Sequence, residues 1–266
     1  VGDLKYVLPE LTDLLSTEFA DQLPNLTEWW NELNAIRKDY PLGYEKPNDG
    51  LGSPEYVLER ISALTGPDAY YVTGVGQHQM WGAHYIQQES PRHFISSAGL
   101  GTMGYGVPAG MGAKVAHPDS TVWIIDGDGC FQMTNQELVT CAQNNIPVKV
   151  AIINNSSLGM VRQWQTLFYN ERYSNTDLKD GHGTVRIPDF VKLGEAYGCA
   201  TFRCERDEDV DATIKAALEI NDRPVVIDFT VSPHALVWPM VPAGVSNDKI
   251  WIAKNTSPEF DREGEN

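Results

Sequence analysis

The feature that most constrains the fold is the alternation of short apolar runs with segments of helical periodicity. The apolar runs are rich in β-branched and aromatic residues and lie near 69–75, 92–97, 121–126, 148–155 and 224–231. Helical patterns lie between and beside them, at about 54–65, 78–88, 104–116, 134–145, 188–197 and 207–220. Apolar strands separated by helices are typical of a parallel sheet that is covered on both faces. We therefore predict an α/β fold, a doubly wound parallel sheet with helices on both faces.

The amino-terminal part is predicted to be a separate unit. Residues 3–40 have helical character, and Asp3 is placed to cap the first helix. The stretch "DYPLGYEKPNDGLGSP" then brings three prolines and three glycines together, which indicates a linker. We predict one unit over residues 1–45 and a second over 46–266. Because the chain begins at Val1 as if leaving a strand, we expect it to be a fragment of a longer protein.

Charge and apolar content argue against several classes of partner. The formal net charge is -16, and no cluster of Lys and Arg stands out, so neither a nucleic acid nor an anionic membrane surface is expected. No apolar run reaches the ~20 residues of a membrane span, and no signal peptide opens the chain. The four cysteines form no C-x-x-C pair and have mostly apolar neighbours, which predicts reduced, buried thiols. These features indicate a cytoplasmic protein.

One glycine pattern suggests a nicotinamide-dependent enzyme. Gly99, Gly101 and Gly104 match the dinucleotide fingerprint G-x-G-x-x-G, after a predicted strand and before a predicted helix. Asp126 ends the next predicted strand, where such an enzyme keeps the acid that binds the ribose. However, Asp126 runs straight into a second glycine-rich turn, "GDGC", which this function does not use. The dinucleotide interpretation is therefore kept as an alternative.

The second turn favours a metal site that holds a phosphate. Between residues 96 and 160 the only cations are two lysines, both predicted to lie far from the carboxyl ends of the strands. Asp128 offers a carboxylate after one strand, and Asn155, 27 residues later, offers an amide oxygen after the next. Mg²⁺ prefers such oxygen ligands and commonly bridges them to phosphates. We therefore predict a Mg²⁺ site at these two residues, with Asp126 shaping the turn.

These motifs resemble a known family. The stretch "GDGCFQMTNQELVTCAQNNIPVKVAIINN" resembles the metal and diphosphate motif of thiamine-diphosphate-dependent enzymes. With "GVGQHQMW", "GLGTMGYGVPAGMGAKVA", "NNSSLGMVRQWQTLFYNERYS" and "VWPMVPAG", essentially the whole chain resembles the carboxyl-terminal part of acetohydroxyacid synthase (acetolactate synthase) catalytic subunits. The resemblance implies decarboxylation of pyruvate and condensation of the hydroxyethyl unit with pyruvate or 2-oxobutyrate, in branched-chain amino-acid biosynthesis. The alternatives are another thiamine-diphosphate-dependent 2-oxo acid decarboxylase or oxidase, and a non-catalytic cofactor-binding domain.

The resemblance also implies roles for individual residues. The expected Mg²⁺ ligands are Asp128, Asn155 and, by its backbone carbonyl, Ser157. The residues expected to contact thiamine diphosphate are Gln77, His78, Gly101, Met103, Gly127, Gly129, Cys130, Asn155 and Met160. The residues expected to line the acceptor-substrate pocket are Met160 and Trp164.

Part of the family's machinery has no counterpart in this sequence. The glutamate that activates the cofactor belongs to an amino-terminal domain of the neighbouring subunit, so no catalytic residue is assigned here and the chain alone is expected to be inactive. FAD rests largely on the middle domain, of which residues 1–45 would be a remnant and linker. The resemblance further implies a homodimer or tetramer and a possible small regulatory subunit. It also implies that residues 158–172 and 233–252 cover the active site.

Overall fold

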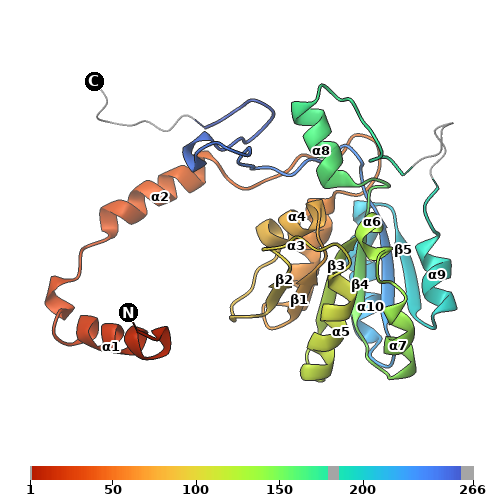
Figure 1. Ribbon diagram of the computed structural model, residues 1–266, viewed down its shortest axis with the longest axis horizontal. Coiled ribbons are helices and arrows are strands. Elements are labelled where there is room, and N and C mark those ends of the chain that lie inside the picture. The colour runs from red at the N-terminus through yellow and green to blue at the C-terminus, as the bar shows by residue number, and fades with distance from the viewer. Residues whose placement is uncertain (1, 179–185, 259–266) are drawn as a thin grey trace. The chain divides into compact units, whose positions relative to one another are not determined.

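The computed structural model describes residues 2–178 and 186–258 and divides the chain into two compact units, residues 1–43 and 44–266 (Figure 1). The smaller unit contains α1 (Leu4–Ser16), the 3-10 turn η1 (Ala20–Gln22) and α2 (Thr27–Asp39). Asp3 caps α1 as predicted, since its side chain accepts a hydrogen bond from the amide of Lys5 at 2.9 Å. No side chain of α1 or α2 is buried among the residues described.

Six parallel strands form the sheet of the larger unit. They are β1 (Tyr70–Thr73), β2 (Phe94–Ser96), β3 (Val122–Gly127), β4 (Lys149–Asn154), β5 (Ala200–Cys204) and β6 (Val225–Thr230). Their order is β2-β1-β3-β4-β6-β5, and every pairing is parallel. The chain runs outward from β1 to β2 and then returns past β1 to β3. Open α/β sheets bind ligands beside such a reversal, at the carboxyl ends of the strands.

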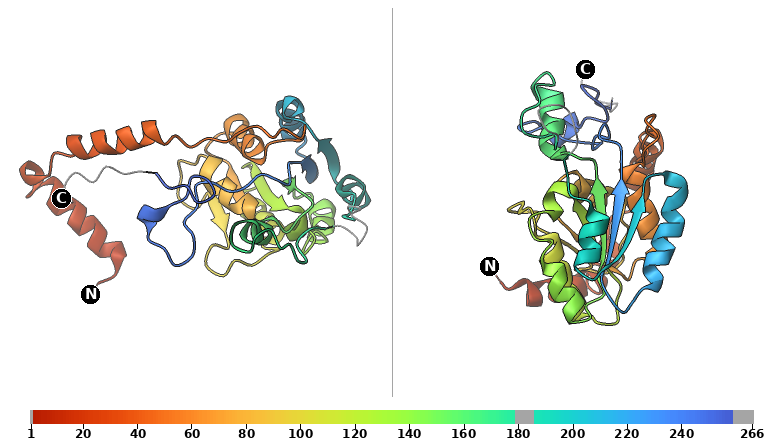
Figure 2. Two further views of the ribbon diagram at one scale, coloured as in Figure 1. Left: turned by 90° about the horizontal axis from the view of Figure 1, so that it is seen from above. Right: turned by 90° about the vertical axis from the view of Figure 1, so that its right-hand side faces the viewer.

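Helices cover both faces of this sheet, as Figure 2 shows, so the predicted fold class is confirmed. One face is covered by α3 (Pro54–Thr65), α4 (Gln77–Tyr85) and α10 (Asp207–Glu219). The other is covered by α5 (Gly106–Ala116), α7 (Glu137–Gln143) and α9 (Phe190–Ala196). Successive side chains of β3 enter opposite cores: Trp123 and Ile125 pack with the first set, and Ile124 with the second. Two helices remain at the carboxyl edge of the sheet, α6 (Asp128–Phe131) and α8 (Gly159–Phe168), and η2 (Asn247–Lys249) follows near the end.

The sequence patterns miss one strand. β5 lies at an edge of the sheet, and of its five residues only Cys204 is buried. Because it carries Arg203 and is half exposed, it lacks the continuous apolar run that identifies the central strands. The other five strands match the predicted runs, except that β3 extends one residue beyond its run, to Gly127, and the six predicted helices lie within a few residues of their observed ends.

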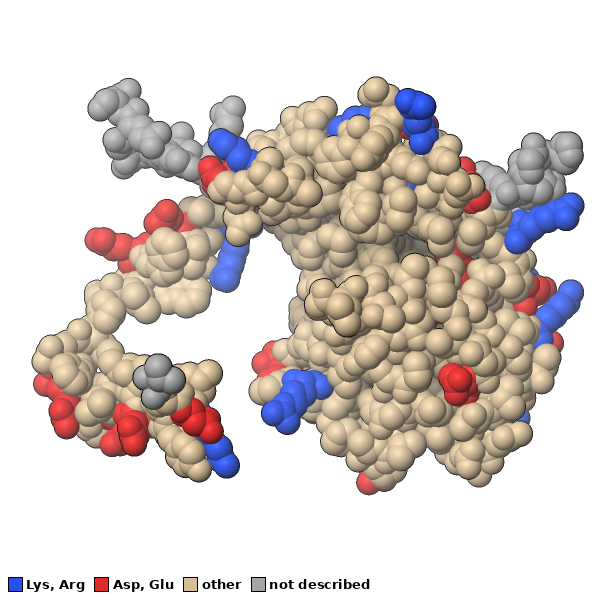
Figure 3. All heavy atoms as spheres, in the orientation of Figure 1, with Lys and Arg blue, Asp and Glu red and all other residues tan. Residues whose placement is uncertain are grey.

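The cysteines are buried, and basic side chains are spread over the surface. Cys130, Cys141, Cys199 and Cys204 are all free and buried, as predicted. On the face shown in Figure 3, the Lys and Arg side chains that are described lie scattered over the surface. No helix in the described ranges is both long and apolar enough to cross a bilayer.

Candidate functional site

A cavity of about 70 Å³ lies at the carboxyl ends of β1, β3 and β4, beside the reversal in strand order. Its walls come from the segments that follow these three strands, together with Trp81 and Met103. The structure gathers most of the predicted site residues there: Gln77, His78, Met103, Gly127, Asp128, Gly129, Cys130, Asn155, Ser157 and Met160. Residues far apart in the sequence are thus brought together because parallel strands end at the same edge of the sheet.

The two predicted metal ligands converge on one backbone amide. The amide of Ser157 donates to Asp128 Oδ2 at 3.1 Å and to Asn155 Oδ1 at 3.2 Å. The three residues are buried, with exposed fractions of 2% for Asp128, 7% for Asn155 and 5% for Ser157. The carboxylate and amide oxygens that Mg²⁺ prefers therefore lie side by side at the cavity wall.

The turn after β4 explains how Ser157 reaches this position. Asn154 ends the strand and is held by Asp228, since its Nδ2 donates to Asp228 Oδ1 at 2.8 Å. Its Oδ1 accepts from the amide of Ser156 at 3.1 Å, and Ser156 adopts a left-handed conformation with a φ of 55°. This tight turn directs the next amide, that of Ser157, back towards β3. Asn154 therefore shapes the turn, and Asn155 faces the cavity.

The electrostatics of the cavity fit a bound cation. Burial raises the pKa of Asp128 to about 7, although backbone amides that donate to the carboxylate offset part of the shift. The two lysines lie at the opposite end of the sheet, as predicted, where Lys114 donates to the carbonyl of Pro118 and Lys149 to that of Ile220. A carboxylate buried without a counter-ion is costly, and a divalent metal would lower its pKa again.

Three glycines lie so close to neighbouring side chains that no larger residue would fit in their place. A Cβ added to Gly127 would lie 2.7 Å from His78 Nδ1, and one added to Gly129 would lie 2.6 Å from Leu158 Cδ2. A Cβ on Gly159 would lie 2.0 Å from Gln77 Oε1. A larger side chain at these positions would therefore clash with its neighbours. All three glycines also line the cavity, where a backbone without side chains allows a phosphate group to approach closely.

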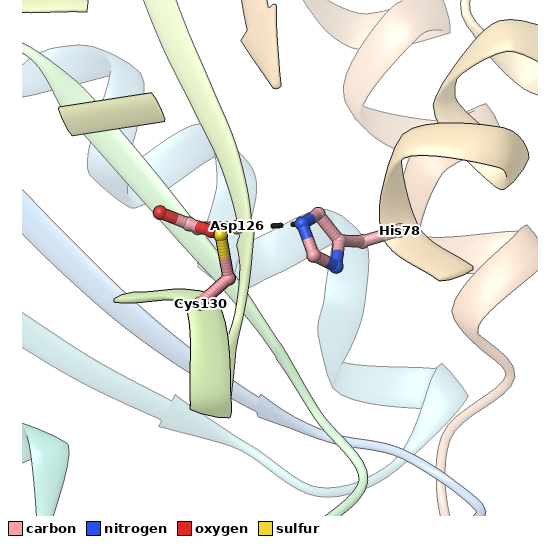
Figure 4. Close-up of side chains that lie close together, drawn as sticks. All are labelled: His78, Asp126 and Cys130. Carbon is pink, nitrogen blue, oxygen red and sulfur yellow. Dashed lines mark ion pairs between the residues drawn. The ribbon is translucent and has the colours of Figure 1, made fainter. Parts of the chain in front are cut away.

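Beside the metal ligands lies a buried cluster of His78, Asp126 and Cys130 (Figure 4). Their ligand-type atoms lie within 4.8 Å of one another, and His78 Nε2 is 3.5 Å from Asp126 Oδ1. Cys130 Sγ accepts from the amides of Val75 at 3.3 Å and Gly104 at 3.1 Å. His78 Nε2 and Asp126 Oδ2 have no hydrogen-bond partner among the residues described. Burial lowers the pKa of His78 to about 3 and raises that of Asp126 to about 7.

The interpretation of Asp126 as a turn-forming residue is incomplete: its Oδ1 accepts from the amide of Gly127 at 3.1 Å, but its surroundings are not those of a turn residue. Asp126 lies inside β3, is fully buried and faces the imidazole of His78. A carboxylate enclosed in this way is also out of reach of a ribose, so the dinucleotide alternative does not fit. Gly99 and Gly101 are exposed in the loop between β2 and α5, away from any tight strand-to-helix turn.

Two predicted site residues lie outside the cavity wall. Gly101 is exposed, has a φ of 65° and donates its amide to the carbonyl of Ser97 at 2.9 Å. Trp164 is 47% exposed and lines a separate hollow on α8 together with Phe168 and Tyr169. Met160, one turn earlier on α8, does reach the cavity, so the two residues assigned to the acceptor pocket face different spaces.

Sequence reasoning missed two polar residues of this region. Asp126 belongs to the cluster with His78, and Gln163 is a fully buried amide on α8. The sequence signal for Asp126 is its position at the end of an apolar run, which is equally typical of the start of a turn. Nothing in the sequence distinguishes Gln163 from Gln165 on the same helix.

Comparison with known proteins identifies the family. Residues 74–229 match the family described as "Thiamine pyrophosphate enzyme, C-terminal TPP binding domain". The chain is 58% identical, over 98% of its length, to an acetolactate synthase of Mycobacterium bovis, and 57% identical over its entire length to one of Mycobacterium leprae. It is 51% identical over 98% of its length to the acetolactate synthase large subunit of Corynebacterium glutamicum. The chain spans only 42%, 42% and 41% of these three relatives. By its matched domain, it belongs to the thiamine pyrophosphate enzymes and carries their C-terminal TPP-binding domain.

Proposed function

We propose that this chain is the Mg²⁺- and diphosphate-binding part of an acetolactate synthase large subunit. The whole enzyme would decarboxylate pyruvate and join the two-carbon unit to a second pyruvate or to 2-oxobutyrate. The observation that carries the proposal is the convergence of Asp128 and Asn155 on the amide of Ser157, within a domain that matches the thiamine pyrophosphate enzymes. The names of relatives that are more than half identical to the chain support the same activity.

The residues of the cavity have distinct roles in this proposal. Asp128 and Asn155 would hold Mg²⁺ by their side-chain oxygens and Ser157 by its carbonyl, with the diphosphate against Gly127 and Gly129. The imidazole of His78 is neutral, because burial lowers its pKa to about 3, and it would donate a hydrogen bond without adding charge. Bound thiamine diphosphate supplies a thiazolium that accepts the electrons released when a 2-oxo acid loses CO₂.

The remaining walls would orient the organic part of the cofactor. Met103 and Met160 border the cavity from opposite segments of the chain and offer apolar, adaptable surfaces. The cavity of about 70 Å³ is well below the ~300 Å³ of a small-molecule site. This small volume is compatible with a site that is completed elsewhere. On the family resemblance, we assign the rest of the cofactor site, including the activating glutamate, to a domain of a second subunit.

The proposal extends to the assembly. A site shared between subunits requires at least a dimer, and we also infer FAD on the missing middle domain and a small regulatory subunit. The name "large subunit" of the Corynebacterium glutamicum relative supports the last of these. Four buried free thiols are compatible with the reducing cytoplasm that we propose as its location.

The test is acetolactate formation from pyruvate by the full-length protein, with and without Mg²⁺ and thiamine diphosphate. We expect activity only when both are present, and none from residues 1–266 alone. Acetolactate made by the 266-residue chain would contradict the proposed division of the active site.

The same assay separates the alternatives. Release of CO₂ without acetolactate would indicate another thiamine-diphosphate-dependent decarboxylase or oxidase. Cofactor binding by the full-length protein with no release of CO₂ would indicate a non-catalytic binding domain.

A further inference from the structure

Gln163 is a fully buried amide whose hydrogen bonds lead in two directions. Its Oε1 accepts from Gln77 Nε2 at 2.9 Å and from the amide of Val237 at 2.9 Å. Its Nε2 donates to the carbonyl of Val237 at 3.2 Å and lies 3.5 Å from Met240 Sδ. A single side chain of α8 thus joins the cofactor side of the cavity to the carboxyl-terminal segment at residues 235–240.

Gln77 extends this chain of contacts to the metal site. Its Nε2 also donates to the carbonyl of Ala235 at 3.2 Å, so the two acceptors of this nitrogen lie on α8 and on the carboxyl-terminal segment. The Oε1 of Gln77 must then point the other way, where it accepts from Asn155 Nδ2 at 3.0 Å. Gln77 is 4% exposed, which leaves its amide little freedom to turn over.

The contact with Gln77 decides which atom Asn155 offers to a cation. An asparagine amide has one oxygen that can bind a metal and one NH₂ group that cannot. Because Nδ2 is engaged by Gln77, Oδ1 is left on the side of Asp128, where it accepts from the amide of Ser157. A flipped Asn155 would direct N–H groups at the metal position.

We propose that Gln163 and Gln77 form an amide relay that holds the oxygen of Asn155 towards Mg²⁺ and couples metal binding to the docking of residues 235–240 on α8. Both are positioning residues in this inference, which rests on the proposed metal site. The relay contains no ionisable group, so the coupling operates through hydrogen-bond direction alone.

The direct test is metal affinity in the full-length protein. Binding of Mn²⁺ as a stand-in for Mg²⁺ is measured by electron paramagnetic resonance in the presence of thiamine diphosphate. We expect Gln163→Met, which is similar in shape but has no amide, to raise the Kd for Mn²⁺ about tenfold. This is the lower end of the effect of losing an outer partner of a metal ligand, because Gln163 acts on Asn155 only through Gln77. Gln163→Glu keeps an acceptor oxygen for Gln77 and for the amide of Val237, and its protonated form, which full burial favours, keeps one O–H donor for the carbonyl of Val237. Its Kd is therefore expected within about threefold of that of the unmodified protein.

The matched control is Gln143→Met, the same substitution at an exposed position at the end of α7. Its Kd for Mn²⁺ is expected to be unchanged. If Gln163→Met folds, as thermal unfolding would show, and binds Mn²⁺ like the unmodified protein, the relay is refuted. If the unmodified protein itself binds no Mn²⁺ with thiamine diphosphate, the proposed function fails instead, so the two failures are distinguishable.

A second measurement needs no substitution. Hydrogen exchange of the peptide that contains residues 233–240 reports the amide of Val237, which bonds Gln163 Oε1. The relay predicts that exchange in this peptide slows when Mg²⁺ and thiamine diphosphate bind, and that Gln163→Met reduces the slowing. Exchange that is the same with and without both ligands in the unmodified protein would also overturn the coupling.

Discussion

The two ends of the parallel sheet both bury ionisable side chains, but they treat them differently. At the amino end, Lys114 donates to two backbone carbonyls of the loop that follows α5. Lys149 donates to the carbonyl of Ile220 and to Asn221 Oδ1, the latter at 3.2 Å. Each buried ammonium group thus has two oxygen partners supplied by the chain itself.

At the carboxyl end the chain leaves such groups incomplete. His78 Nε2 and Asp126 Oδ2 have no hydrogen-bond partner in the described part of the chain, and burial raises the pKa of both Asp126 and Asp128 to about 7. Folded proteins rarely keep buried polar atoms unpaired unless a site needs them. The two lysines at the amino end are therefore satisfied by the chain itself, although His93 Nδ1, just before β2, also lacks a partner among the described residues. The carboxyl end differs in burying carboxylates that have no cationic partner, which agrees with the proposed Mg²⁺ site.

The largest effect is expected for Asp128→Asn in the full-length protein. It keeps an oxygen but removes the negative charge from the proposed Mg²⁺ site, so we expect acetolactate formation to fall by at least ~100-fold. Thermal unfolding without metal should occur at an equal or higher temperature, because a carboxylate that is 2% exposed is no longer buried without a counter-ion.

The control is Asp211→Asn, which removes a carboxylate of α10 that pairs with Arg60 at 2.6 Å, outside the cavity. Its activity should be unchanged. Asp128→Asn with near-normal activity, or with a large loss of stability, would mean that the carboxyl end is completed by folding after all.

The second prediction concerns pH. The pKa of Asp126 is raised from 3.8 to about 7 by burial, so between these values the unfolded state loses its proton before the folded state does. Asp126 therefore contributes stability below pH 3.8 that is lost as the pH rises towards 7, at no more than ~1.4 kcal/mol per pH unit. His78 cannot compensate by becoming charged, because its pKa is lowered to about 3.

We expect Asp126→Asn, an uncharged replacement of similar shape, to gain stability relative to the unmodified protein as the pH rises from 4.5 to 7. The gain should be on the order of 1 kcal/mol per pH unit, measured by urea unfolding without metal. A difference between the two proteins that stays constant over this range would contradict the buried, proton-binding state of Asp126.

Much of the fold, and the pairing of Asp128 with Asn155, could be predicted from the sequence. The central strands are recognisable because both of their faces are buried, which demands continuous apolar runs such as that of β4. β5 lies at the sheet edge and is largely not buried, so its sequence has no continuous apolar run. Asp128 and Asn155 could be paired because each follows a strand of the same parallel sheet, and the closeness of the two residues to the amide of Ser157 agrees with that inference.

What the sequence could not reveal depends on side-chain direction. A run of residues does not show that Asp126 is still inside the strand and faces His78, because one further residue would turn its side chain to the other face. Residue type likewise cannot separate Gln163, which is fully buried, from Gln165, two positions along α8. Both misses concern polar groups whose role depends on tertiary contacts.

The smallest effect is expected at the amino end of the sheet, from Lys149→Met. The substitution leaves the carbonyl of Ile220 without its ammonium partner, but it also relieves a buried charge whose pKa is lowered to about 8, chiefly by burial. These effects oppose each other, so the net loss in the free energy of unfolding should be about 1 kcal/mol.

Activity per folded molecule should not change, because Lys149 begins β4, whereas Asn155 follows its last residue, roughly 20 Å away. Urea unfolding and acetolactate assays on the same preparation check both parts, and a fivefold loss of activity at unchanged stability would show that the two ends of the sheet are not independent.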